Sequence, residues 1–241
     1  MKTIHAAVII SALLLIQGCS TSNKTVSYEW NTSADPLEDL NRSIYTFNNQ
    51  AGRLILRPVA SNYHSVMPDP AEKGVYNFFS NLGEPLSVVN NLLQGKLDGA
   101  LHSTYRFAVN STIGLLGFID VAKYQGVEKK REDLGQTLAT WGVKPGPYLM
   151  LPFIGPTNLR DGISGAISTG IYYPIGEITD SSDGRIGLSV LNVINARADL
   201  LQFDETINKQ LDPYLFIKST FENSRTKAIN DGVENELDFD L

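Results

Sequence analysis

Apolar residues recur every three or four positions along most of the chain, a spacing that predicts short amphipathic helices. The first predicted helix begins at Asp35-Pro36, because Asp35 suits an N-cap and Glu38 can reach back to complete a capping box. Its apolar face runs to about Gln50. Frequent Gly and Pro interrupt the pattern, so the later helices should also be short. They are predicted over residues 57–67, 69–82, 85–95, 96–110, 132–140, 157–170, 184–201 and 204–229, the last with a break at Pro213.

Two largely apolar stretches do not follow the helical spacing. Residues 111–122 are broken by Gly114 and Gly117 and carry a single charge at Asp120, and residues 141–155 are punctuated by Pro and Gly. Neither stretch alternates convincingly between apolar and polar positions, as a half-buried strand would, and nor does any other. We therefore predict an all-α fold made mostly of short amphipathic helices.

The N-terminus carries a different signal. Lys2 precedes an apolar run that is shorter than the ~20 residues needed to span a bilayer, which is typical of a secretory signal. The run ends in Gly18-Cys19, which resembles a bacterial lipobox, so the Cys19 thiol would carry a diacylglyceryl anchor. A plain secreted protein with a free thiol in its signal is the alternative. The predicted parts are a lipoprotein signal peptide (1–18), a lipidated tether (19–34), one helical domain (35–230) and an acidic tail (231–241).

Composition and charge narrow the choice of partners. The chain has 241 residues and a formal net charge of −6, and it lacks the clustered Lys and Arg that nucleic acid binding requires. The same balance argues against a polybasic grip on anionic lipid, so a membrane contact should be apolar. Cys19 is the single cysteine, which excludes an internal disulfide and a Cys-rich metal site in the mature chain.

A lipid hydrolase is the rival functional class. It needs a nucleophile beside a base, and His64 and His102 are the two histidines of the mature chain. The string Gly162-Ile163-Ser164-Gly165 lacks the spacing of a nucleophile elbow, and no P-loop or H-E-x-x-H motif is present. A triad of Ser164, His102 and an aspartate is therefore disfavoured. We expect no catalytic residue, no metal and no cofactor.

Six sequence blocks occur in an order typical of one known family. They are DPLEDLNRSIYTFN (Asp35–Asn48), NFFSNLGEP (Asn77–Pro85), VNNLLQGK (Val89–Lys96), RFAVNSTIGLLGFIDVA (Arg106–Ala122), GQTLATWGVKPGPY (Gly135–Tyr148) and LPFIGPTNLRD (Leu151–Asp161). Behind a lipobox, and over nearly the whole chain, these blocks resemble the MlaA (VacJ) lipoproteins of Gram-negative outer membranes. Lys144-Pro145 departs from the family pattern, in which small or flexible residues are common, and this puts the shape of that loop in doubt.

The resemblance implies a mostly helical, ring-like protein that lies in the inner, periplasmic leaflet of the outer membrane around a central amphipathic channel. Glycerophospholipid mislocated to the outer leaflet would enter the channel and pass to a soluble MlaC-like periplasmic carrier, which maintains lipid asymmetry. The family also associates with trimeric porins, so a porin partner is implied. A non-transporting structural lipoprotein bound to a porin is the alternative.

The resemblance and the residue pattern together indicate where the channel is controlled. Residues 111–122 fit a movable gate, because glycines absorb backbone changes easily, and an ordinary buried hairpin is the alternative. Valine at Gly114 and Gly117 should stiffen such a gate and leave the fold intact. The gate candidates are Ile113, Gly114, Leu115, Leu116, Gly117, Phe118, Ile119 and Asp120.

Polar and aromatic residues near the start of the domain have two interpretations. Asn41, Arg42 and Asn48 are candidates for a polar channel lining, or they cap neighbouring segments. Arg42 could pair with a lipid phosphate, although a structural ion pair is favoured. Phe78 and Phe79 could contact acyl chains, although core packing is favoured for aromatic residues at helical spacing.

The tail also has two interpretations. Leu237, Phe239 and Leu241 alternate there with acidic residues. The tail is either a disordered, solvated end or a peptide that folds when it docks on a carrier.

Overall fold

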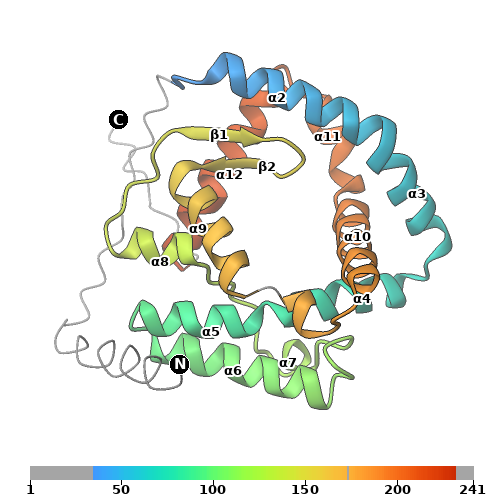
Figure 1. Ribbon diagram of the computed structural model, residues 1–241, viewed down its shortest axis with the longest axis vertical. Coiled ribbons are helices and arrows are strands. Elements are labelled where there is room, and N and C mark those ends of the chain that lie inside the picture. The colour runs from blue at the N-terminus through green and yellow to red at the C-terminus, as the bar shows by residue number, and fades with distance from the viewer. Residues whose placement is uncertain (1–34, 173, 232–241) are drawn as a thin grey trace.

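The structure is a computed structural model that describes residues 35–172 and 174–231. The described part is mostly helical, which confirms the predicted class, and its elements are arranged around a ring in Figure 1. The signal peptide, Cys19, the tether and residues 232–241 of the tail lie outside the described residues, so the predictions made for them stay predictions.

The domain begins with one long helical run. α2 (Glu38–Ala51) continues through the π-helical turn η1 (Gly52–Leu56) into α3 (Arg57–Val66), without the predicted interruption between them. Pro58 cannot donate a backbone hydrogen bond, and the wider π turn just before it accommodates this loss. The predicted capping box is also absent from this helix start, because Glu38 instead accepts a 2.7 Å hydrogen bond from Arg42 Nε.

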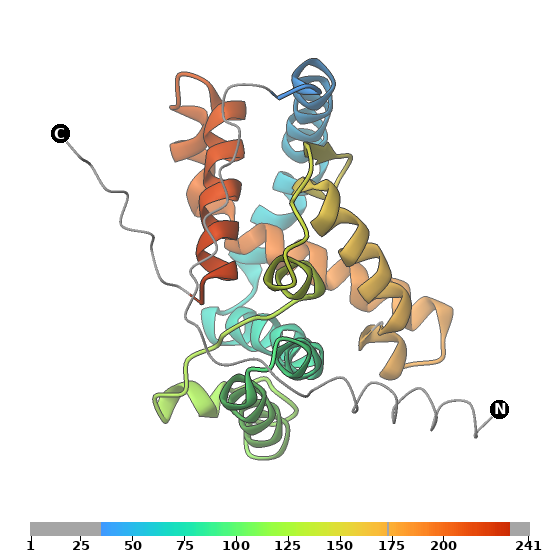
Figure 2. The same cartoon turned by 90° about the vertical axis from the view of Figure 1, so that its left-hand side faces the viewer.

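The next helices occupy ranges close to those predicted. They are α4 (Asp69–Leu82), α5 (Glu84–Leu93) and α6 (Leu97–Thr112). The short α7 (Val121–Tyr124) follows in a segment for which no helix was predicted. α5 and α6 lie side by side in both Figure 1 and Figure 2, with α5 bordering the ring and α6 outside it. The loop from residue 113 to residue 120 joins α6 to α7 on this outer side.

A small hairpin contradicts the prediction that the chain contains no strands. β1 (Tyr148–Leu151) and β2 (Gly155–Asn158) pair antiparallel, with Tyr148 opposite Asn158 and Leu151 opposite Gly155. Each strand has four residues, which is too short for an alternating pattern to stand out. Phe153 and Gly155 adopt left-handed backbone angles, with φ of 63° and 97°, and so close the turn.

The remaining elements complete the ring. They are α8 (Leu134–Thr140), α9 (Leu159–Ile171), η2 (Pro174–Glu177), α10 (Ser182–Asp199), η3 (Leu201–Phe203), α11 (Asp204–Asn208) and α12 (Pro213–Ile229). α10 packs against α3 and α4 on the side of the ring opposite the hairpin (Figure 1). The predicted break at Pro213 is confirmed, since Asp212 caps α12 by accepting a 3.1 Å hydrogen bond from Leu215 N–H.

Burial in this fold is inverted relative to a water-soluble protein. Among the described residues, twenty polar or charged side chains are buried but only ten hydrophobic ones. On α6, Ser103, Arg106 and Asn110 face inward, whereas Leu97 and Leu101 are 67% and 68% exposed. Water-soluble proteins normally bury their large apolar side chains and expose their charges. The amphipathic helices therefore turn their polar faces toward one another.

Other helices repeat this arrangement. Further exposed apolar residues on α5, α9 and α10 are Val89, Leu92, Leu93, Leu159, Ile163, Ile167, Ile171, Ile186, Val190 and Val193. A small apolar core does exist beside the hairpin, where Tyr148, Met150 and Tyr214 pack together. Within the described ranges, no helix is both long enough and apolar enough to cross a bilayer.

Candidate functional site

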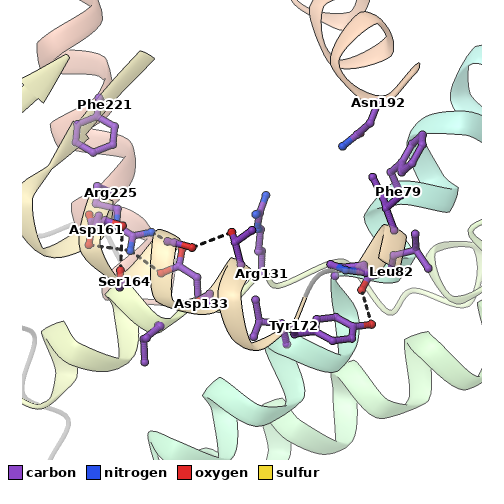
Figure 3. A pocket seen from close by; sticks show the side chains of 18 residues that line it. Phe79, Leu82, Arg131, Asp133, Asp161, Ser164, Tyr172, Asn192, Phe221 and Arg225 are labelled. Carbon is purple, nitrogen blue, oxygen red and sulfur yellow. Dashed lines mark hydrogen bonds and ion pairs between the residues drawn. The ribbon is translucent and has the colours of Figure 1, made fainter. Parts of the chain in front are cut away.

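A cavity of about 480 Å³ lies among the elements of the ring. One wall is apolar and comes from α4, α5 and the segment after α9, and the other is polar and comes from α8, α9 and α12. Figure 3 shows Phe79 and Leu82 on one side of the open space, and Arg225, Asp161 and Asp133 on the other. The residues used below are Phe79, Leu82, Leu86, Tyr172 and Ile175 of the apolar wall and Arg131, Asp133, Asp161, Ser164, Thr169 and Arg225 of the polar wall.

The polar wall is organised around Arg225 of α12. Its Nη1 and Nη2 atoms donate to the two carboxylate oxygens of Asp133 at 2.7 and 2.6 Å. Its Nε and Nη2 atoms donate to Asp161 at 2.7 and 3.1 Å. Asp161 also accepts hydrogen bonds from Asn158 Nδ2 at 2.6 Å and from Arg160 Nε at 2.8 Å. One guanidinium therefore joins the starts of α8 and α9 to the last helix.

Local sequence places these carboxylates. Asp133 is the N-cap of α8 and accepts from Gln136 N–H at 2.9 Å, and Asn158 is the N-cap of α9 and accepts from Asp161 N–H at 2.8 Å. Gly135 is required between them, because a Cβ there would lie 2.3 Å from Asp161 Oδ1 and 2.4 Å from Arg225 Nη2. The two N-caps and Gly135 thus allow the start of α8, the start of α9 and Arg225 of α12 to approach one another closely.

The network keeps Asp133 and Arg225 charged. Burial raises the pKa of Asp133, but hydrogen bonds from Arg225 and its positive charge lower that pKa more, so it lies below its ordinary value. Burial lowers the pKa of Arg225, whereas Asp133 and Asp161 raise it, and the net effect is a rise. The polar wall therefore presents fixed charges at neutral pH.

The apolar wall is closed by one hydrogen bond. Tyr172, which directly follows α9, donates from its hydroxyl to the carbonyl oxygen of Leu82 at 3.3 Å (Figure 3). Tyr172 lines the cavity together with Leu82, Leu86 and Phe79. Phe79 was expected to pack in a core and instead lines the cavity, while Phe78 stacks on Phe118 with 5.1 Å between ring centroids.

The predicted polar lining holds secondary structure together instead. Asn41 Nδ2 donates to Tyr148 O at 3.0 Å, and Asn41 Oδ1 accepts from Met150 N–H at 2.8 Å. Asn48 makes the same pair of bonds to Leu151 O and Phe153 N–H, at 2.9 and 2.8 Å. The two amides therefore fasten the hairpin to α2, and neither lines the cavity.

Arg42 also has protein partners. It pairs with Glu38 at 2.7 Å and with Asp212 at 2.8 Å, as the favoured interpretation of a structural ion pair predicts. Its guanidinium lies 4.5 Å from the centroid of the Tyr214 ring. It is absent from the cavity lining, so the structure gives no support to its role as a phosphate ligand there.

The eight gate candidates lie outside the cavity lining. Asp120 accepts from Arg106 Nη2 at 2.8 Å and from Asn110 Nδ2 at 2.9 Å, and Arg106 Nε donates to the buried Glu84 at 3.0 Å. Asn110 Oδ1 also accepts from Ala122 N–H at 3.0 Å. Asp120 is thus an anchor between α6 and α7, and the base of the loop is fixed.

The tip of this loop is exposed and its glycines are enclosed. Leu115 and Leu116 are 65% and 68% exposed, with left-handed φ angles of 52° and 59°. A Cβ on Gly114 would lie 2.2 Å from Ile119 O, and a Cβ on Gly117 would lie 2.7 Å from Asn81 Cβ. The expectation that valine at both glycines would leave the fold intact is therefore wrong, because neither position has room for a side chain. Ile113, Ile119 and Phe118 are also exposed.

Ser164 and His102, the serine and histidine of the disfavoured hydrolase triad, have separate surroundings. Ser164 is buried and donates its hydroxyl proton to Asp161 O at 3.0 Å. His102 Nδ1 is buried and has no hydrogen-bond partner in the described part of the chain. Burial, and to a smaller extent the positive charge of Lys130, lowers the pKa of the His102 imidazole. The hydrogen bond that the Ser164 hydroxyl donates therefore goes to a backbone carbonyl and not to a histidine.

The sequence alone did not point to the residues of the polar wall. Arg225 lies 92 positions from Asp133 and 64 positions from Asp161, so no local spacing connects them. Their one local signal is the capping pattern that starts α8 and α9, which predicts helix boundaries but not a shared partner.

The chain is similar to proteins of one known family. The MlaA lipoprotein family model matches residues 33–228. The intermembrane phospholipid transport system lipoprotein MlaA of Escherichia coli K12 is 37% identical over 228 residues, which cover 92% of this chain and 86% of that protein. The protein of the same name from Haemophilus influenzae is 29% identical, with 96% and 93% covered.

A solved structure gives the same result. It comes from work on the structural basis for maintenance of bacterial outer membrane lipid asymmetry, and it superposes with a TM-score of 0.70 at 35% sequence identity. The match covers 82% of this chain and 99% of the other. An uncharacterized protein of Rickettsia felis is 37% identical, with 81% and 78% covered. The chain therefore belongs to the MlaA lipoprotein family.

Proposed function

We propose that this protein takes glycerophospholipid from the outer leaflet of the Gram-negative outer membrane and passes it toward a periplasmic carrier, which maintains lipid asymmetry. The cavity carries the proposal, because its polar wall faces an apolar wall within one space of about 480 Å³. A phospholipid has a charged head and apolar tails, so it needs both kinds of wall. Relatives named as intermembrane phospholipid transport lipoproteins support this function.

The exposed apolar faces support a position within the leaflet. Apolar side chains on α5, α6 and α9 would be stabilised by roughly 25 cal/mol for each Å² that hydrocarbon covers. Backbone groups in helices are paired internally, as hydrocarbon requires. Acyl chains on Cys19 would add a stable anchor on the periplasmic side.

Transport through this protein is passive, since the sequence carries no nucleotide-binding motif. Direction would come from the MlaC-like carrier and from an energy source beyond it. A trimeric porin would hold the ring in place in the membrane. The exposed tip at Leu115 and Leu116 would act as the gate by contact with lipid tails, rather than by movement of its anchored base.

The acidic tail would provide a docking site for the carrier. Deletion of residues 232–241 should weaken carrier binding in a pull-down and leave the described domain folded. Unchanged binding would return the tail to a solvated end with no partner. A tail in which the acidic residues are kept and Leu237, Phe239 and Leu241 become serine separates the apolar contribution from the charge.

The decisive experiment measures outer-leaflet phospholipid in cells that lack the protein. Complementation uses the wild type, Cys19→Ala, Thr169→Trp and Thr112→Trp. Thr169 and Thr112 are matched, because both are exposed on helices and both donate to the carbonyl four residues earlier, but Thr169 alone lines the cavity. Tryptophan at Thr169 should occupy part of the cavity and narrow it.

Accumulation in the deletion strain, reversed by the wild type and Thr112→Trp but not by Cys19→Ala or Thr169→Trp, supports anchored transport through the cavity. An unchanged outer leaflet in the deletion strain contradicts transport. The protein would then be a structural lipoprotein.

A further inference from the structure

Three consecutive basic residues precede α8, and their surroundings differ. Lys129 Nζ donates to the carbonyl and hydroxyl oxygens of Ser80, both at 2.6 Å. Lys130 is exposed and lies outside the cavity wall. Arg131 lines the cavity, and its side chain points into the open space in Figure 3. Of these three basic residues, Arg131 alone lines the cavity.

The other charged groups of the polar wall already have direct ion-pair partners. Arg225 and Arg160 are paired with Asp133 and Asp161 at distances from 2.6 to 2.8 Å, so that two guanidinium groups meet two carboxylates. Arg131 makes no ion pair and no side-chain hydrogen bond with any residue in the described ranges. Its positive charge acts on Asp133 and helps to lower the pKa of that carboxyl, but the side-chain hydrogen bonds of this carboxylate come from Arg225, so the guanidinium of Arg131 keeps its donors for a ligand.

The backbone beside Arg131 is held in place. Glu132 N–H donates to Ser87 Oγ at 3.2 Å, and Ser87 Oγ lies 3.3 Å from Glu132 O. Asp133, one residue further, is fixed by its two bonds from Arg225. A side chain on a fixed backbone loses less freedom when it binds a ligand, which favours affinity.

The surroundings define the ligand chemistry. A guanidinium binds phosphate oxygens through two parallel hydrogen bonds, and a cation facing a cavity attracts an anion. Phe79, Leu82 and Leu86 form the apolar side of the same cavity. A ligand that satisfies both features joins a phosphate to an apolar chain.

We infer that Arg131 binds the phosphate of a glycerophospholipid in the cavity while the start of its tails lies against Phe79, Leu82 and Leu86. The inference rests on the proposed function and adds the group that recognises the substrate. Arg131 is thus a head-group ligand, and the phosphate common to all glycerophospholipids is the group it selects. Diacylglycerol, which has the same tails without phosphate, should be bound poorly.

The test uses calorimetric titration of the purified, full-length lipoprotein in a neutral sugar detergent. The probes are dihexanoyl phosphatidylethanolamine, dihexanoylglycerol and inorganic phosphate. The variants are Arg131→Gln, Arg131→Lys and Lys130→Gln, where the last removes the neighbouring charge outside the cavity. Thermal unfolding checks that each variant is folded, as expected for exposed residues.

Arg131→Gln should weaken phosphatidylethanolamine binding about tenfold, because one charge-assisted contact is lost, and Lys130→Gln should leave it unchanged. Arg131→Lys should fall between the wild type and Arg131→Gln, and dihexanoylglycerol affinity should be the same in all variants. Equal phosphatidylethanolamine affinity in the wild type and Arg131→Gln overturns the inference and leaves the transport proposal intact. Inorganic phosphate binding as tightly as the lipid also overturns it. A wild type that binds neither lipid removes both the inference and the transport proposal.

Discussion

Arg225 of α12 donates two hydrogen bonds, of 2.7 and 2.6 Å, to the carboxylate of Asp133 at the start of α8. With Asp161 as a third member, this pair connects the last helix to the middle of the chain. Arg225→Ala leaves Asp133 without its hydrogen-bonded cation and Asp161 with Arg160 alone, so we expect a loss of about 3 kcal/mol in the free energy of unfolding. Chemical denaturation in detergent measures it.

The matched control is Lys209→Ala. Lys209 pairs with Glu205, but both side chains are more than two thirds exposed, and such pairs contribute about 0–1 kcal/mol. Equal losses in the two variants would mean that the Arg225 network does not hold the ring together.

The same network predicts how stability depends on pH. The pKa of Asp133 is raised by burial but lowered more by Arg225, and so lies below the unfolded value of about 3.9. The stabilisation is complete above the unfolded pKa and is lost as pH falls through the folded pKa. Asp120 behaves in the same way, since Arg106 and Asn110 more than offset its burial.

Thermal unfolding measured downward from pH 6 should therefore show a steep decline below about pH 4 in the wild type. Arg225→Ala should decline less over that range, because Asp133 no longer has a lowered pKa. Parallel curves for the two proteins would contradict this origin of the acid sensitivity.

Asn41 should matter for stability rather than for a channel lining. Asn41→Ala leaves Tyr148 O and Met150 N–H without these partners in a buried position, which costs about 2–3 kcal/mol. Amide exchange at Met150 should accelerate. Gln50→Ala, at an exposed position on the same helix, should change neither quantity. Lower lipid transport with unchanged stability in Asn41→Ala would restore the predicted role in the lining.

The tip of the 113–120 loop provides a test of the gate. Serine at both Leu115 and Leu116 removes exposed apolar surface without filling any enclosed space, so folding should be preserved and clearance of outer-leaflet phospholipid should fall. Normal clearance by this variant would remove the gate from the proposal.

Gly114→Ala measures the enclosed part of the same loop. It should lose more than about 2 kcal/mol, because its Cβ must displace backbone atoms that now lie within 3 Å. Leu116 has a left-handed φ of 59°, and this conformation costs a leucine about 1–2 kcal/mol. Leu116→Gly removes that cost, but glycine also gives the unfolded chain more conformational freedom, which destabilises the folded state. Its stability should therefore stay within about 1 kcal/mol of the wild type.

The sequence predicts most helices because their boundaries depend on local chemistry. The Asp212-Pro213 start of α12 is an example, since a capping carboxylate and a proline act within one turn. The continuous run from α2 to α3 was missed because its π turn has no recognised sequence signal. The hairpin was missed because its strands are short and are held by Asn41 and Asn48 from a distant helix.

Helical spacing does not determine whether an apolar face is buried or exposed. Leu97, Leu101 and Tyr105 recur at helical spacing on α6, yet all three side chains are exposed. Periodicity identifies which residues share a side of a helix, whereas the surrounding solvent decides which side is covered. The cavity wall was harder still, because Arg225 reaches partners 92 and 64 positions away.

A ring whose inner contacts are polar has mechanical properties of its own. Apolar contacts tolerate sliding, because dispersion forces have little directional preference. Hydrogen bonds weaken steeply when they are bent or stretched, so the amides, carboxylates and guanidinium groups between these helices fix their spacing. In the proposed position within a leaflet, the aperture of the ring should therefore keep a constant width as the bilayer thins or thickens, and the protein would act as a rigid frame.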